Sequence, residues 1–202
     1  MIARHVHDAL AQVKRLQSLI LERRFFEGYS GRARVLSGFA ALGCACLLDS
    51  GLLPCTPAAH LAGWTAALLM ALALNYGALA WWFLFDPEVR RNARLLKPAV
   101  DAVPALAVGA VLSAALIVAG QHRLLFGAWM SLYGLAQVAY RQSLPPGIYA
   151  VGLGYLLAGA VCLLAPAVIF LNPWPMGIVF FVGELTGGAV LLMKDKGKEG
   201  DD

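Results

Sequence analysis

Six long apolar runs dominate the sequence and leave most of its charged residues to the two terminal segments and the short connections between runs. The runs cover residues 33–53, 58–85, 99–120, 124–140, 148–170 and 176–193. A helix needs about 20 predominantly apolar residues to cross the hydrocarbon core of a bilayer. We therefore predict an all-α polytopic membrane protein, whose six transmembrane helices form three consecutive hairpins within a domain over residues 33–193.

The composition excludes several classes of protein. Of the 202 residues, 60% are hydrophobic and 14% are charged. Soluble domains are about 45–50% apolar and about 25% charged. Neither a disordered chain, a collagen nor a soluble enzyme has this balance. Six spanning helices use about 120 residues, which leaves no room for a soluble domain of ordinary size.

Two flanking segments are expected to lie in the cytoplasm. Residues 1–32 predict an amphipathic helix over 3–28, whose apolar side contains Val6, Ala9, Leu10, Val13, Leu16 and Ile20. This helix can lie on the membrane surface, with its Lys and Arg near anionic headgroups, or it can dock a partner protein. Both readings remain open. The polar residues 194–202 predict a disordered tail.

The distribution of positive charge predicts the orientation. Fifteen of the 16 Lys and Arg residues fall on the side of the charged N-terminal segment, residues 86–98, residues 141–147 and the tail. Only Arg123 falls on the other side. Because cytoplasmic loops carry the excess of Lys and Arg, we expect a multi-pass protein of the inner (cytoplasmic) membrane with both termini in the cytoplasm. The basic balance then requires no nucleic-acid partner.

Glu184 is the leading candidate for a site within the membrane. It lies about halfway along the last run, where an ionised carboxylate costs at least about 2.5–3.5 kcal/mol unless it is partnered, protonated or hydrated. Asn75 and Tyr133 are expected at similar depth, and each can donate a hydrogen bond to it. The group can serve as an ion or ligand contact, or as a hydrogen-bonding link between helices.

A second set of polar residues is expected at the outer face. Asp49, Cys55, His60 and His122 are of metal-ligand types, but their spacing matches no metal motif, which favours separate interfacial residues over a metal site. Asp49 ends the first run, where the helix dipole disfavours a carboxylate. An ion pair between Asp49 and Arg123 would compensate for this.

Small residues recur every four positions on several of the runs. They include Gly63, Ala67 and Ala71, then Ala150, Gly154 and Ala158, and finally Gly183 and Gly187. Stripes of this kind let helix backbones approach closely in lipid. The pattern predicts a compact bundle and is compatible with a homodimer.

The last predicted hairpin, from Gly154-Tyr155 to Leu192, has a Pro-bearing turn and glycines at 154, 159, 177, 183, 187 and 188. In these features it resembles the repeated hairpins of bacterial acid-resistance membrane proteins of the HdeD type. The whole chain resembles uncharacterised six-span bacterial inner-membrane proteins with a basic N-terminal helix. These resemblances imply a helical membrane fold. They cover no catalytic motif and supply no site residues.

Two function classes remain. The sequence holds no recognisable set of nucleophile, base and orienting group, no phosphate-binding glycine loop and no paired His for haem. We therefore expect no enzyme activity and no cofactor. The first class is a non-catalytic sensor, regulator or accessory subunit, with the bilayer and a partner bound through residues 3–28. The alternative is a small transporter or channel for protons, ions or a small solute that uses Glu184.

Overall fold

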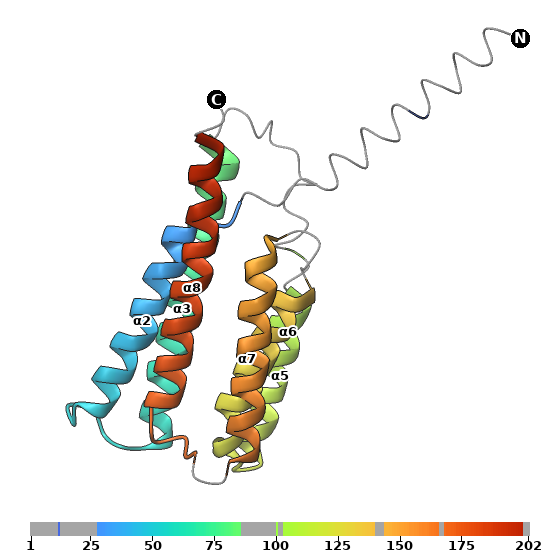
Figure 1. Ribbon diagram of the computed structural model, residues 1–202. Helices are drawn as coiled ribbons and strands as arrows, with labels where there is room; N and C mark the ends of the chain where they lie inside the picture. The colour runs from blue at the N-terminus through green and yellow to red at the C-terminus, as the bar shows by residue number, and fades with distance from the viewer. Residues whose placement is uncertain are drawn as a thin grey trace, which may run out of the picture.

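The computed structural model describes residues 28–85, 103–139, 144–165 and 168–199, together with the single positions Gln12 and Val100. Within these ranges every regular element is a helix, as the all-α prediction requires (Figure 1). Apart from Gln12 and Gly28, the predicted surface helix over 3–28 lies outside the described residues, as do the segments 86–98 and 141–143.

The helices run in chain order as α2 (Gly31–Asp49), α3 (Pro57–Phe85), α5 (Val103–Val118), the 3-10 turn η3 (His122–Leu124), α6 (Leu125–Ala139), α7 (Pro146–Leu164) and α8 (Trp174–Glu199). Four of them, α2, α3, α7 and α8, are long and apolar enough to cross a membrane, and α5 is a shorter apolar helix. The chain is thus a helical bundle of multi-pass membrane type.

Capping side chains and a turn glycine fix the ends of α2 and the start of α3. Ser30 caps α2 by accepting a hydrogen bond from the Ala33 amide at 3.3 Å. Thr56 does the same for α3 from the Ala59 amide at 3.3 Å, with Pro57 at the first helical position. The turn after α2 contains Gly51, whose φ of 75° lies in the left-handed region that favours glycine.

The C-terminal boundary of the last helix differs from the prediction. The sequence predicts disorder from residue 194, whereas α8 continues to Glu199. No proline interrupts residues 194–199, so the helical backbone can continue past the apolar run.

The six α-helices named above form two groups of three, which lie side by side in Figure 1. We call α2, α3 and α8 the terminal unit, because they come from the two ends of the described chain. We call α5, α6 and α7 the central unit. The most extensive packing is between α2 and α8 and between α6 and α7. Both of these interfaces join helices from different predicted hairpins.

Glycines bring the helices of each tight pair almost backbone to backbone. A Cβ atom added to Gly31 would lie 2.7 Å from the Gly188 carbonyl oxygen, between α2 and α8. A Cβ atom added to Gly134 would lie 2.7 Å from the Gly152 carbonyl oxygen, between α6 and α7. Close approach of this kind provides van der Waals packing, which drives helix association where lipid supplies no hydrophobic force.

An aromatic cluster joins the two units at the end of the bundle that carries the connections after α2, α5 and α7, which we call the turn end. Trp64 of α3 meets Phe126 of α6 edge to face, with ring centroids 5.7 Å apart. Phe126 also contacts Phe170, between α7 and α8, at 5.0 Å. The three side chains are buried and belong to one core. They fix the units to each other at this end.

Candidate functional site

A buried ion pair joins α2 to α8. The Arg34 guanidinium donates two hydrogen bonds to the Glu184 carboxylate, from Nε to Oε2 at 2.9 Å and from Nη2 to Oε1 at 2.8 Å. Arg34 is 7% exposed and Glu184 is 3% exposed. Two parallel bonds from a planar guanidinium fix both the distance and the orientation of the pair.

Glycines leave the space that the pair occupies. A Cβ atom added to Gly187 would lie 2.7 Å from Cζ of Arg34. One added to Gly38 would lie 3.1 Å from Cβ of Glu184. A side chain at position 187 would therefore displace the guanidinium, which explains why a small residue stands one turn after the glutamate.

Two tyrosine hydroxyls from the central unit complete the site. Tyr133 of α6 donates to Oε1 of Glu184 at 2.7 Å, and Tyr155 of α7 donates to the same oxygen at 3.1 Å. Their rings meet at 89° with centroids 5.0 Å apart, and both pack against Phe180 of α8. One carboxylate thus connects α8 with α2, α6 and α7.

The contacts fit an ionised carboxylate. Each oxygen of Glu184 accepts a bond from Arg34, whose nitrogens can only donate. The hydroxyls of Tyr133 and Tyr155 supply two further donors to Oε1. Opposite charges with extra hydrogen bonds can remain in an apolar interior, where either charge alone would be costly.

Gln137 extends the site from α6. Its Oε1 accepts a long hydrogen bond of 3.4 Å from Nη2 of Arg34, while its Nε2 has no hydrogen-bond partner among the described residues. The side chain is buried. Gln137 lies near the end of the fourth predicted run, where a polar residue is expected at the membrane interface, and the structure places it beside the ion pair.

Asn75 does not reach Glu184 by any hydrogen bond in the described structure. Its Nδ2 donates to Ser37 Oγ of α2 at 2.9 Å and to the Ala71 carbonyl of its own helix at 2.9 Å. Ser37 in turn donates to the Ala33 carbonyl at 2.9 Å. Asn75 therefore links α3 to α2 beside the site, because α3 packs on α2.

Of the three residues proposed from sequence, Glu184 and Tyr133 come together and Asn75 stays one helix away. Sequence reasoning missed Arg34 and Tyr155. A signal for Arg34 existed, since it is the only Lys or Arg within the six predicted runs. No comparable signal separates Tyr155 from the other tyrosines.

No protein-family model, curated protein or solved structure matches this chain.

The predicted pair at the turn end is arranged differently. Oδ2 of Asp49 accepts a hydrogen bond from Nε1 of Trp174 at 3.0 Å, which connects the end of α2 to the start of α8. Arg123 lies in η3. The described residues contain one ion pair, that of Arg34 with Glu184, so within them Asp49 and Arg123 are not paired.

The four residues of metal-ligand type are also not brought together. Among the described residues no group of three or more His, Cys, Asp and Glu side chains could hold a metal ion. Nε2 of His60 lies 3.0 Å from the Leu171 carbonyl oxygen, so this buried ring ties α3 to the connection before α8. The His122 ring packs against Phe170, and Cys55 is exposed.

A double-mutant cycle should separate the two arrangements of Asp49. The variants Asp49→Asn and Trp174→Phe are expected to couple by about 0.5 kcal/mol, because the bond is exposed and its acceptor is charged. The cycle of Asp49→Asn with Arg123→Gln should give no coupling. Unfolding in detergent micelles would measure both. Coupling of Asp49 to Arg123, with no coupling of Asp49 to Trp174, would contradict the observed hydrogen bond.

Proposed function

We propose that this chain is a non-catalytic regulatory or accessory subunit of a bacterial inner membrane, which it crosses six times with both termini in the cytoplasm. Four long apolar helices support the membrane assignment. α5 and α6 are shorter helices that lie alongside α7 (Figure 1), and we count each of them as a crossing, which makes six. Only an even number keeps the charged segments on one side, as the positive-inside rule requires.

The observation that carries the proposal is the complete engagement of Glu184. Its oxygens accept bonds from Arg34, Tyr133 and Tyr155, which come from three other helices. A carboxylate held in this way stabilises the association of the two units. A group that binds and releases ions in each cycle would have to break these bonds every time. The site therefore favours a role in holding the bundle together.

The partner surface is expected in the cytoplasm. The predicted amphipathic helix over residues 3–28 offers one apolar face next to the basic loops of the inner side. Binding energy from such a helix comes from apolar residues at intervals of three and four positions. We propose that this face docks a cytoplasmic or membrane partner, with a second copy of the chain as the alternative partner.

Native mass spectrometry near natural abundance tests the proposal. We expect a partner in fixed stoichiometry that is lost when Val6, Leu10 and Val13 are replaced by Ser. The matched control replaces Lys14, Ser18 and Glu22 of the opposite face by Ala and should retain the partner. A partner that both triple variants retain, or no partner at all, would contradict docking through residues 3–28.

Transport through Glu184 is the second candidate. Its support is that the hydroxyls of Tyr133 and Tyr155 span the two units, so relative movement of the units would open the site. In liposomes loaded with a pH-sensitive dye, we expect no proton or potassium flux above that of empty vesicles. A flux that Glu184→Gln abolishes, and that Asp49→Asn leaves intact, would replace the first proposal by this one.

A further inference from the structure

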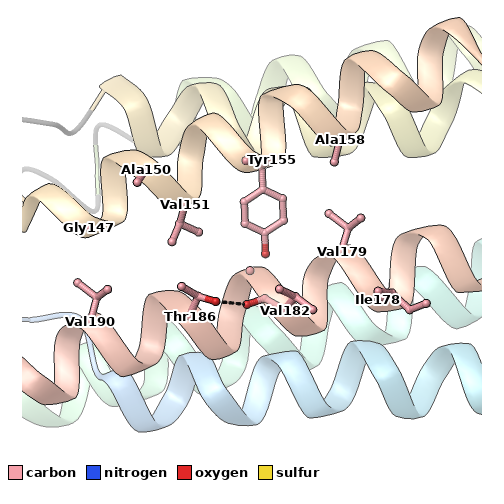
Figure 2. A pocket seen from close by; sticks show the side chains of 12 residues that line it. Gly147, Ala150, Val151, Tyr155, Ala158, Ile178, Val179, Val182, Thr186 and Val190 are labelled. Atoms are coloured by element: carbon pink, nitrogen blue, oxygen red, sulfur yellow. Dashed lines mark hydrogen bonds between the residues drawn. The ribbon is translucent and has the colours of Figure 1, made fainter.

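A groove of about 620 Å³ runs between α7 and α8, on the boundary of the two units (Figure 2). Small residues predominate on its α7 wall, beside Val151 and Tyr155, and branched residues predominate on its α8 wall, beside Gly183. Its exposed positions include Ala150, Gly154, Ile178 and Val182. Tyr155 projects from α7 toward α8 across the groove. A Cβ atom added to Gly154 would meet no atom within 4 Å, so this part of the groove is open.

The groove offers no free polar group from its side chains. The Thr186 hydroxyl donates to the Val182 carbonyl of its own helix at 2.7 Å (Figure 2). The Tyr155 hydroxyl donates to Glu184. The remaining lining side chains are apolar, or absent at the glycines. Any occupant must therefore be apolar along the length of the groove, since a polar group would lose its hydrogen bonds there.

The groove is continuous with a surface that faces lipid. α7 and α8 are both long and apolar enough to span the membrane. Leu153 and Leu157 of α7 are 44% and 69% exposed, and Leu185 of α8 is 40% exposed. Such leucines can be exposed in a bilayer because acyl chains cover them. The groove lies among these helices and follows their direction, as acyl chains do.

We propose that one acyl chain of a bilayer lipid occupies this groove as a specific site. A flexible chain can follow a groove that is open at Gly154 on α7 and ridged by Ile178 and Val182 on α8. Helices approach most closely in lipid along stripes of small residues, whereas the α8 wall presents Ile178 and Val182 with a single glycine, Gly183, and therefore suits a flexible chain better. The occupant packs against the Tyr155 ring, and so supports the hydroxyl that contacts Glu184.

A retained photoreactive lipid tests the proposal. The full chain is reconstituted with a phosphatidylcholine that carries a diazirine in the middle of one acyl chain, extracted into mild detergent, washed and then irradiated. We expect labelling to remain on groove residues of α7 and α8. Gly154→Trp should abolish this labelling, because the indole would fill the open part of the groove.

Gly77→Trp is the matched control. A Cβ atom added to Gly77 of α3 also meets no atom within 4 Å, so a tryptophan there is equally accommodated but lies outside the groove. It should leave the labelling unchanged. Ala150→Phe, also at an exposed groove position, should likewise abolish the labelling, and it replaces Gly154→Trp if that variant does not fold.

Three results would overturn the proposal. Absence of retained label on the groove residues of the wild-type chain would contradict the proposal. Equal loss in Gly77→Trp would show that the lipid is held outside the groove. A wild-type dimer that Gly154→Trp converts to monomer would identify a second copy of the chain as the occupant.

Discussion

Replacing Glu184 by glutamine is expected to lower the free energy of unfolding by about 3–5 kcal/mol. The substitution keeps the size of the side chain and removes its charge, so Arg34 becomes a buried cation without a counter-ion. The Tyr133 and Tyr155 hydroxyls would also lose a charged acceptor. The loss should be visible in equilibrium unfolding of the protein in detergent micelles.

A second substitution separates the cost of the unpaired Arg34 charge from the cost of the lost hydrogen bonds. Adding Arg34→Gln to Glu184→Gln removes the unpaired cation, and the double variant is expected to recover most of the stability. Asp49→Asn makes the same chemical change at an exposed carboxylate and should cost well under 1 kcal/mol. A double variant no more stable than Glu184→Gln alone would show that the ion pair does not govern the stability.

Gly134→Ala is expected to give the second largest effect, a loss of about 3 kcal/mol, the upper end of the range for overpacked cores. The new Cβ atom would lie 2.7 Å from the Gly152 carbonyl oxygen and 2.8 Å from the Leu156 amide nitrogen. Both of these atoms belong to the α7 backbone, which cannot turn away as a side chain can. α6 and α7 must move apart, which also draws Tyr133 away from Glu184.

Gly154→Ala provides the control for this prediction. It makes the same change on α7, where the added Cβ atom meets nothing within 4 Å, and should alter the stability by no more than about 0.5 kcal/mol. Unfolding in the same micelles compares the two variants directly. Equal effects at Gly134 and Gly154 would mean that the loss reflects glycine replacement in general and not the α6–α7 contact.

The fold class and the centre of the candidate site could be predicted from the sequence. Apolar runs predict helices of membrane length. A single acid in the last run indicates where polar partners are needed to stabilise it. Glu184 and Tyr133 were reachable by these arguments. Both depend on the position of a residue along its own helix.

The remaining partners depend on which helices are neighbours. Arg34 stands at the start of the first run, where a long basic side chain usually reaches back to the membrane surface, so its charge was assigned to the cytoplasmic side. Its true partner lies on a helix at the other end of the chain. Asn75 contacts Ser37 and not Glu184, because α3 packs against α2.

The terminal unit cannot be completed until the last helix has been made. Arg34 and Glu184 are 150 positions apart. At about 5–20 residues per second, a ribosome synthesises Glu184 about 8–30 s after Arg34. Until then Arg34 lacks the carboxylate that neutralises its charge, and we expect its guanidinium to stay near the headgroups until Glu184 arrives. In a chain that stops before α8, Arg34 never acquires its carboxylate partner. The ion pair therefore also distinguishes a finished molecule from an interrupted one.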